Sequence, residues 1–346
     1  MDQRRFCTTA RVIIVAGKGG VGKTTVVAAL AVVAARSGLS VLIAEVEGKS
    51  GLSKAFGVSD LEYEEIVLAK GISARTLTPD AALSEWLQGN GLGRIARRLS
   101  ASGILEIVAT AVPGMKDILV LGKIKSLEQS NTFDLILVDA PAAGHAVSFL
   151  TSPLGLLEAV GVGPIKAQAN DVVAMLTDPT RSQVMLVTTP EETPVREAIE
   201  TAFTLEDRVG VALGPIVVNG IYPVETHIAA QADLNRAGDL ANPVNFDRAG
   251  VAETISLDAH ACGLVISPDE IKDMVDAISF RTARSKVQSH QADQLRESLP
   301  IPQMRLPYLF DGEIGLSQIE KLADALETQI AMLPDPIPGE RVGSDE

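Results

Sequence analysis

Residues 17–25 of this chain read GKGGVGKTT and have the types and spacing needed to hold phosphate groups. Glycines let the backbone wrap around phosphates with its N–H groups pointing inward, at the positive end of a helix dipole. In the GxxxxGK[ST] pattern, Lys23 holds the β and γ phosphates and the Thr24 hydroxyl ligates Mg²⁺. The sequence therefore predicts a site for ATP and Mg²⁺ formed by Gly17, Lys18, Gly19, Gly20, Val21, Gly22, Lys23, Thr24 and Thr25.

A second lysine in the loop, Lys18, points to a narrower class. The GKGGVGKT form resembles the deviant Walker A motif of the ATPases that include MinD and ParA, nitrogenase iron protein, the arsenite-pump ATPase and the ATPase that targets tail-anchored proteins. The resemblance implies a nucleotide-sandwich dimer in which Lys18 reaches the partner's nucleotide and is catalytic together with Lys23. A lysine placed there neutralises charge on the transferred phosphoryl group. The alternative is an exposed loop lysine without a catalytic role.

Residues 47–56, EGKSGLSKAF, are similar to the switch I stretch DPAHSLSDAF of the arsenite-pump and targeting ATPases. Glu47 falls where that family carries the aspartate that positions or activates the attacking water, so the resemblance makes Glu47 a candidate catalytic residue. Its carboxylate lies one methylene farther out than that of aspartate. Glu45 is the competing candidate. The alternative is that both glutamates merely face solvent at a strand end.

Residues 133–150, FDLILVDAPAAGHAVSFL, resemble the switch II pattern DTAPTGHTLRFL of the same family. Asp139, at the end of an apolar strand, is placed like a Walker B carboxylate that holds the Mg²⁺ shell through water. The resemblance implies that Gly144 and His145 sense the γ-phosphate, although a lone histidine is often structural.

Two later segments, 187–198 and 217–220, resemble the family's nucleotide-contact elements. By this resemblance Asn219 reads the adenine edge, Glu191 reaches nucleotide from near the interface, and the loop after residues 304–309 closes on the base. An Asn amide offers the donor and the acceptor that adenine requires. The alternative for Asn219 is a turn at a strand end.

The two cysteines, Cys7 and Cys262, separate the branches of this class. They form no CxxC pair, which argues against zinc, and they are too few for clustered metalloid ligands or an iron–sulfur cluster. What remains resembles a bacterial homologue of the anion-transporting, arsenite-pump and Get-type ATPases.

The elements that position these residues follow from apolar runs at 12–16, 41–44, 135–139, 184–188, 216–219 and, less regularly, 304–309. Each run suits a buried strand, and most are separated by segments long enough for crossover helices. We therefore expect an α/β fold with a doubly wound, mostly parallel sheet.

Residues 81–126 and 151–178 are helical in pattern, which predicts a helical subdomain inserted into an ATPase domain of residues 1–80, 127–150 and 179–333. Residues 221–262 are polar and irregular. Ser267, Pro268 and Glu270 form a helix-start signature, so 269–298 are expected to be one long helix or two short ones. The tail, 334–346, is expected to be disordered.

The charge balance, 30 Lys and Arg against 44 Asp and Glu, gives a formal net charge of -14 and argues against a nucleic-acid partner. No stretch suits a transmembrane helix, which predicts a cytoplasmic protein. Between residues 90 and 126, cations outnumber carboxylates. This excess indicates either a solvated face or a surface that binds an acidic partner or anionic lipid. In the latter case the protein would be located peripherally at the membrane. The charged residues are Arg94, Arg97, Arg98, Lys116, Lys123 and Lys125 against Glu106 and Asp117.

An apolar stripe in 81–126 is expected to be buried against a neighbouring helix or a dimer partner, the alternative being a groove for a hydrophobic client. Its members are Leu83, Trp86, Leu87, Leu92, Ile95, Leu99 and residues 104–112. The leading hypothesis is a Mg²⁺-dependent ATPase, a homodimer or a heterodimer with a paralogue, that couples nucleotide state to a helical subdomain engaging a partner. The alternative is a nucleotide-gated chaperone or binding subunit with vestigial hydrolysis, active only with its paralogue.

Overall fold

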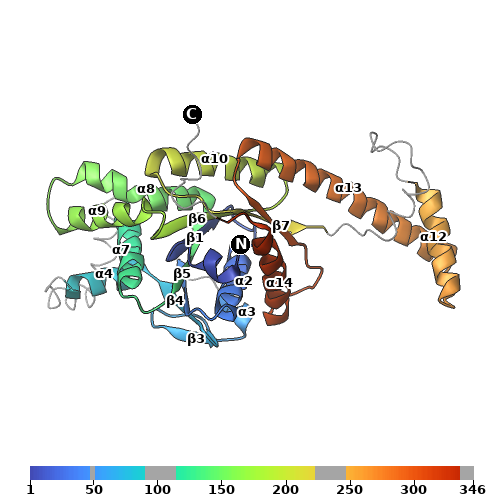
Figure 1. Cartoon of the computed structure of the whole chain (residues 1–346), viewed down its shortest axis with the longest axis horizontal. Helices are drawn as coiled ribbons and strands as arrows, with labels where there is room; N and C mark the ends of the chain where they lie inside the picture. The colour runs from blue at the N-terminus through green and yellow to red at the C-terminus, as the bar shows by residue number, and fades with distance from the viewer. Residues whose placement is uncertain (47–50, 90–113, 223–246, 336–346) are drawn as a thin grey trace.

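The computed structural model describes residues 1–46, 51–89, 114–222 and 247–335. In this part of the chain an eight-stranded sheet has the order β3-β4-β2-β5-β1-β6-β7-β8 (Figure 1). All neighbouring strands are parallel except β3 and β4. The strands are β1 Val12–Gly17, β2 Val41–Val46, β3 Ile66–Ala69, β4 Ile72–Leu77, β5 Leu135–Ala142, β6 Ser182–Thr188, β7 Ile216–Ile221 and β8 Gln303–Pro307.

Helices cover both faces of the sheet because both faces of its central strands are apolar. In β1, Ile13 and Val15 face one core and Ile14 faces the other, and all three are buried. The first core is closed by α1 Gln3–Cys7, α2 Lys23–Arg36, α3 Gly51–Phe56 and α14 Leu316–Met332. The second is closed by α4 Pro79–Gly89, α7 Met115–Gln129, α8 Ala143–Ala159, α9 Pro164–Leu176 and α10 Glu192–Val209. The expectation of a doubly wound, mostly parallel α/β fold is confirmed.

Strand β1 lies between β5 and β6, with Val15 paired to Asp139 on one side and to Met185 on the other. The carboxyl ends of these parallel strands meet at one edge of the sheet. Ligands of open α/β sheets bind at that edge, where connections depart in opposite directions. The loop that follows β1 is therefore in the position that a nucleotide requires.

Five of the six expected strands fall within strands of the structure, and the sixth, 304–309, is a strand only as far as Pro307, where β8 ends. Strands β3 and β4 were not predicted. Strand β4 is buried along its whole length even though it contains Ser73, Arg75 and Thr76. Two of these side chains contact groups inside the protein: the Thr76 hydroxyl donates to Glu45, and the Arg75 guanidinium lies 4.5 Å from the centre of the Tyr63 ring. The polar residues interrupt the apolar run that marks a buried strand, so the pattern gave no signal.

Helices α4, α7, α8 and α9 pack against one another beside the sheet (Figure 1). On α4, Leu83 and Leu87 are buried in the core and Trp86 packs against it, which agrees with burial against neighbouring helices. The rest of the stripe, residues 92–112, lies outside the described residues. The division of the chain into an ATPase domain and an inserted helical subdomain stays a prediction.

Two of the cations expected to form a local positive surface are already paired. Lys123 bonds to Glu85 at 2.5 Å, and Lys125 bonds to Asp171 at 2.9 Å. Both carboxylates lie outside the 90–126 window in which the charges were compared. The positive excess near α7 is therefore smaller than that window indicates.

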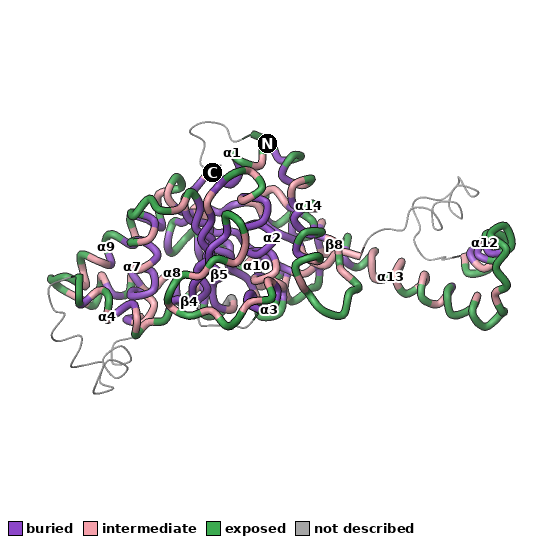
Figure 2. Tube along the Cα trace, turned by 90° about the horizontal axis from the view of Figure 1, so that it is seen from below, coloured by how far each residue is buried: buried purple, intermediate pink, exposed green. Residues whose placement is uncertain are grey.

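Two further helices, α12 Arg248–Ala261 and α13 Pro268–Ser298, form a hairpin that extends away from the sheet (Figures 1 and 2). The expectation of irregular structure is wrong for α12, which begins where the Asp247 side chain accepts a hydrogen bond from the Gly250 backbone N–H. The expectation of a long helix is confirmed by α13, and Ser267 and Glu270 form its capping box. Of the expected tail, 336–346 lie outside the described residues. In the described part of the chain, no helix has the length and apolar character needed to cross a membrane.

Candidate nucleotide-binding site

The loop between β1 and α2 has a geometry that only glycine permits at two positions. At Gly17 an added Cβ would lie 2.1 Å from the carbonyl oxygen of Val187 on β6, so the loop passes directly over the neighbouring backbone. Gly22 has φ 91°, in the left-handed region that side chains disfavour, and ends the loop as the N-cap of α2. The backbone therefore leaves a concave cradle at a helix N-terminus, the geometry that binds phosphates.

Lys23 is buried and turned back over this loop. Its Nζ donates to the carbonyl oxygens of Gly17 at 2.9 Å and Lys18 at 3.0 Å. Around it Gly19 and Gly20 are exposed at the top of the loop, while Val21 is buried beneath. The ammonium group thus lies at the floor of the cradle, where the charge of a polyphosphate would be held.

Thr24 and Asp139 form the part of the site that suits a divalent cation. The Thr24 hydroxyl, on the first turn of α2, donates to Asp139 Oδ2 at 2.6 Å. Asp139, on β5, is 1% exposed. A hydroxyl and a carboxylate held together beside a phosphate cradle match the oxygen ligands that Mg²⁺ prefers, so the residues fit Mg²⁺. The next residue, Thr25, is half-buried beside Thr24.

Glu45 lies next to Asp139 in the sheet, since the two residues are register partners on β2 and β5. It is 1% exposed, and its Oε2 accepts a hydrogen bond from Thr76 on β4 at 3.1 Å. The alternative in which Glu45 faces solvent is therefore wrong. Glu47, the other candidate, lies outside the described residues.

Lys18 is held by its own chain in this structure. Its Nζ bonds to Glu197 Oε1 on α10 at 2.5 Å, and both side chains are about one-third exposed. No sequence pattern predicted the contact of Lys18 with Glu197, because the two residues are 179 positions apart. Lys18 is half-buried on the loop, in contrast to the buried Lys23.

Asn219 lies on β7 and Glu191 is the N-cap of α10. The Asn219 amide Nδ2 donates to the carbonyl oxygen of Val21 at 2.9 Å, so it touches the phosphate loop. Glu191 precedes α10 and pairs with Arg284 on α13. The structure thus brings Asn219 to the loop, whereas Glu191 is bound to the long helix.

An aromatic cluster follows directly after β7 and β8. The rings of Tyr222 and Tyr308 stack with their centres 5.0 Å apart, and Phe310 packs against both. Phe310 begins the loop expected to close on a base, and Tyr308 lies in the segment directly before it. Sequence reasoning assigned no residue there, although three aromatic residues in a chain with only 3% aromatics are a usable signal.

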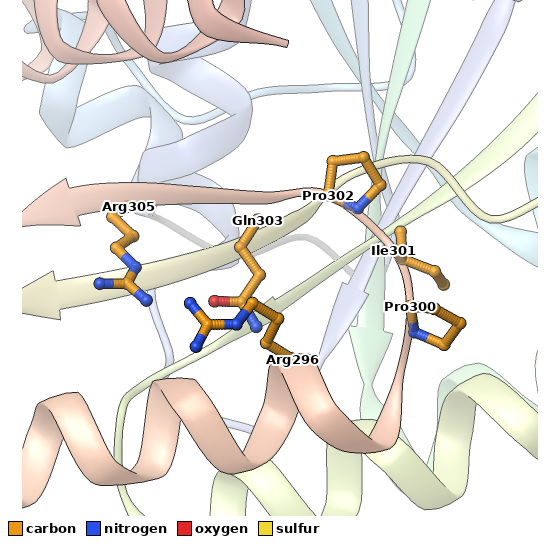
Figure 3. A pocket seen from close by; sticks show the side chains of 6 residues that line it. All are labelled: Arg296, Pro300, Ile301, Pro302, Gln303 and Arg305. Atoms are coloured by element: carbon orange, nitrogen blue, oxygen red, sulfur yellow. The ribbon is translucent and has the colours of Figure 1, made fainter. Parts of the chain in front are cut away.

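Two hollows in the surface of the described residues differ in their position relative to the phosphate loop. One borders the loop and is lined by Thr24, Thr25, Gly51, Lys54, Ala55 and Ile314. The other lies where β8 begins, at the opposite edge of the sheet, and is lined by Arg296, Pro300, Ile301, Pro302, Gln303 and Arg305 (Figure 3). Asp293 pairs with both arginines of this second hollow and therefore offsets one of their two positive charges.

A phosphate loop after the central strand of a doubly wound sheet, with a Thr–Asp pair beside it, defines a P-loop nucleotide-binding protein. Residues 10–161 match the family model described as anion-transporting ATPase. The chain is 32% identical over 333 residues to ATPase BagA of Mycobacterium tuberculosis, an alignment that covers 92% of this chain and 93% of that protein. It is 30% identical over 154 residues to ATPase get3 of Schizosaccharomyces japonicus, covering 44% of this chain and 47% of that one.

The chain belongs to the anion-transporting ATPase family, in the branch that includes the ArsA and Get-type ATPases. The resemblance drawn from GKGGVGKTT and the two switch-like segments is thereby confirmed, as is the expectation of an ATPase.

Proposed function

We propose that this chain is a Mg²⁺-dependent, ATP-hydrolysing dimer whose nucleotide state is coupled to the helices α4, α7, α8 and α9, which engage a partner protein. The observation that carries the proposal is the arrangement of Lys23, Thr24 and Asp139 at the end of β1 and β5. It combines a buried ammonium group with a hydroxyl–carboxylate pair. These are the groups needed to hold a triphosphate and its metal.

Each residue of the loop has a separate role in this proposal. Backbone N–H groups of Gly19, Gly20, Gly22 and Thr25 bind phosphate oxygens, and Lys23 takes the charge of the β and γ phosphates. Thr24 and Asp139 hold Mg²⁺. When bound, the ion neutralises charge on the phosphates and orients them. Asn219, which already contacts the loop through Val21, is proposed to read the adenine edge, and Glu191 to reach nucleotide near the interface.

Lys18 is proposed to leave Glu197 and reach the nucleotide of the partner subunit. The Lys18–Glu197 pair is partly solvent-exposed, and such pairs are weak, so a polyphosphate can compete for the lysine. In the partner's site the ammonium group would stabilise charge on the transferred phosphoryl group. The isolated chain is then a resting form, and assembly supplies the missing cation.

The attacking water is proposed to be positioned by Glu47. Glu45 is buried and bonded to Thr76, which favours a supporting role through the β2–β4 pair. Substituting each glutamate by glutamine separates these roles. Loss of turnover in Glu47→Gln with near-normal turnover in Glu45→Gln supports the assignment, and the reverse result contradicts it.

The test of the proposed function is ATP hydrolysis by the purified chain with Mg²⁺ and with the metal chelated. We expect hydrolysis that requires Mg²⁺ and is lost in Lys23→Ala, while Lys70→Ala, which changes an exposed lysine between β3 and β4, retains it. Wild-type turnover in Lys23→Ala would refute the proposal.

A second candidate function is a nucleotide-gated binding subunit in which hydrolysis is vestigial and needs a paralogue. The observation that favours it is the Lys18–Glu197 pair, which keeps the lysine on its own chain. Normal basal turnover in both Lys18→Ala and Glu47→Gln would show that neither residue has the catalytic role proposed for it. Co-purification with a paralogous chain, together with turnover only in the mixture, would establish this alternative.

The partner is proposed to be a membrane protein or a hydrophobic client, with the chain in the cytoplasm and at the membrane surface while it engages that partner. Support comes from the helical layer of α4, α7, α8 and α9 on one side of the sheet (Figure 1). Flotation of the chain with vesicles, with and without ATP, measures this association. No flotation in either state would restrict the proposal to a soluble client.

A further inference from the structure

Helix α13 begins far from the sheet and ends against it (Figures 1 and 2). Near its carboxyl end, Ala292 and Leu295 are buried in the core that α10 also closes. When the same stripe is followed toward the amino end at helical spacing, its next members are Gln288, Arg284 and Arg281. The side chains that α13 turns toward the sheet therefore change from apolar to polar along the helix.

The three polar side chains of this stripe contact three segments at the carboxyl edge of the sheet. Gln288 bonds to the backbone at the end of β7. Arg284 pairs with Glu191, the N-cap of α10, and the guanidinium of Arg281 lies 4.8 Å from the centre of the Phe310 ring, after β8. Each segment contains or adjoins a residue proposed to contact the nucleotide. This part of α13 therefore belongs to the nucleotide edge.

Gln288 is the buried member of the three, at 3% exposed, whereas both arginines are half-buried. Its Nε2 donates to the Gly220 carbonyl oxygen at 3.1 Å, and its Oε1 accepts from the Tyr222 backbone N–H at 2.8 Å. The direction of the amide is fixed, because a backbone N–H can only donate and a carbonyl can only accept. Replacing this side chain would leave two backbone groups without their hydrogen bonds, at a cost larger than the net strength of the bonds.

Strand β6 stops before the segment that Gln288 holds. It ends at Thr188, which is paired with Val218, while β7 continues to Ile221. From the β8 side, the Tyr308 N–H donates to the Ile221 carbonyl oxygen. The Gln288 amide offers one donor and one acceptor, as a neighbouring strand does. Gln288 therefore continues the support of β7 past the end of β6.

Asn219 directly precedes the backbone that Gln288 holds. Its amide donates to the Val21 carbonyl oxygen at 2.9 Å, and a Cβ on Gly22 would lie 2.3 Å from the amide nitrogen, so the side chain is closely packed against the phosphate loop. The residue after it, Gly220, has φ 79° and, as a glycine, could adopt many other conformations. Holding the Gly220 carbonyl therefore restricts the backbone from which Asn219 extends.

We propose that Gln288 is a positioning residue for Asn219. By holding the backbone of Gly220 and Tyr222, it keeps the Asn219 amide against the phosphate loop, in place to read the adenine edge. The inference rests on the proposed function, because that function assigns the reading of adenine to Asn219. It adds that the preference of the site for its base depends on a side chain of α13, outside the motifs that identify the site.

Titration of the purified full-length chain with ATP and with GTP tests this role by binding alone. Gln288→Met keeps the approximate length of the side chain and removes its donor and acceptor. We expect the Kd for ATP to rise about tenfold, the size expected for one lost hydrogen bond, and the Kd for GTP to change little. Gln294→Met, at an exposed glutamine of the same helix, is the matched control and should keep both Kd values. An unchanged preference for ATP over GTP in Gln288→Met would overturn the inference, even if the variant is less stable.

Hydrogen exchange in the wild-type chain provides a test that needs no variant. If the contact between Gln288 and Tyr222 favours ATP binding, ATP must stabilise that contact by the same factor. Saturating ATP should therefore slow exchange of the Tyr222 amide by about tenfold, and GTP should slow it less. Exchange of this amide that is the same with and without ATP would contradict the positioning role.

A double variant separates this inference from the proposed function. Because Gln288 is proposed to act through Asn219, Gln288→Met combined with Asn219→Ala should show the base preference of Asn219→Ala alone. Losses that multiply would overturn the inference. If Asn219→Ala lowers the preference for ATP and Gln288→Met does not, the positioning role fails and the proposed function stands. If Asn219→Ala keeps the wild-type preference, the proposed reading of adenine fails together with this inference.

Discussion

At the phosphate edge of the sheet, Lys23, Glu45 and Asp139 are almost completely buried, and each is held by a named hydrogen bond. In the hairpin of residues 248–298 formed by α12 and α13, which we call the arm, the relation is reversed, since Phe280 and Leu264 are exposed and the buried core consists of few residues. Buried polar groups in one region indicate chemistry that needs fixed positions. Exposed apolar groups in the other region indicate a surface to which a partner can bind.

The largest expected difference between the regions is in stability. Ile124 on α7 is fully buried in the main core, and Ile255 on α12 is 8% exposed in the arm. Ile124→Ala should lower the free energy of unfolding by about 2–5 kcal/mol. Ile255→Ala should change it much less, because the arm can open locally. Denaturant unfolding measures both. Equal losses would show that the arm unfolds together with the sheet.

A second prediction compares the effects on turnover of substituting two aspartates that are close together in the sequence. Asp139→Asn should lower kcat/KM for ATP by at least about 100-fold, since it weakens the hydroxyl–carboxylate pair proposed to hold Mg²⁺. Asp134→Asn should leave turnover nearly unchanged, because Asp134 precedes β5 and bonds to Ser40 at the opposite edge of the sheet. Steady-state turnover, with circular dichroism to verify folding, measures both. Equal losses would argue against a metal site at Thr24 and Asp139.

A smaller difference in stability is expected between alanine substitutions at two glycines with positive φ. Gly57 has φ 67° and space for a Cβ, whereas a Cβ at Gly22 would lie 2.3 Å from the Asn219 amide nitrogen. Gly57→Ala should cost about 1 kcal/mol of backbone strain. Gly22→Ala should cost about 1 kcal/mol more and weaken ATP binding, because it displaces Asn219 from its hydrogen bond to Val21. Thermal unfolding and nucleotide titration measure these effects. Recovery of thermal stability in the double variant Gly22→Ala/Asn219→Ala supports the account, and no recovery of stability contradicts it.

The smallest expected effect is the pH dependence of two serine-bound carboxylates, one in each region. Hydrogen bonds from the backbone N–H and hydroxyl of Ser40 lower the pKa of Asp134, and those of Ser267 lower the pKa of Glu270. Each group therefore contributes stability above its unfolded pKa of about 4, and the contribution is lost as the pH falls through the lowered folded value.

Asp134→Asn should make global stability less sensitive to acid, since Asp134 joins the starts of β2 and β5. Glu270→Gln should alter only hydrogen-exchange protection in the first turn of α13. An equal effect of Glu270→Gln on global unfolding would contradict the separation of the two regions.

The sequence predicted the phosphate edge better than the arm for a physical reason. GKGGVGKTT and the carboxylate of Asp139 are local patterns whose spacing is set by the shape of a phosphate, and apolar runs such as 12–16 mark buried strands. Strand β4 gave no signal because its polar residues interrupt the apolar pattern, and Thr76 and Arg75 contact Glu45 and Tyr63, which lie elsewhere in the chain. Helix α12 gave none because Gly250, Thr254 and Ser256 weaken the helical pattern.

The contacts of the candidate site were not predictable from spacing alone. Lys18 meets Glu197, and Glu191 meets Arg284, only after the helices have packed. The motif predicted a role for Lys18 across a dimer, whereas in the single chain the lysine pairs with Glu197. The sequence therefore identified the chemical groups of the site, and the fold shows which contacts hold each group in position.

The most direct test of the account is ATP hydrolysis by a mixture of two inactive variants, Lys18→Ala and Lys23→Ala. In a mixed dimer, the Lys18→Ala chain keeps Lys23 in its own loop and receives Lys18 from its partner, so one complete site forms. If chains pair at random, the mixture should recover about a quarter of the wild-type rate. A mixture that gives only the sum of the two residual rates would contradict the proposed action of Lys18 across a dimer.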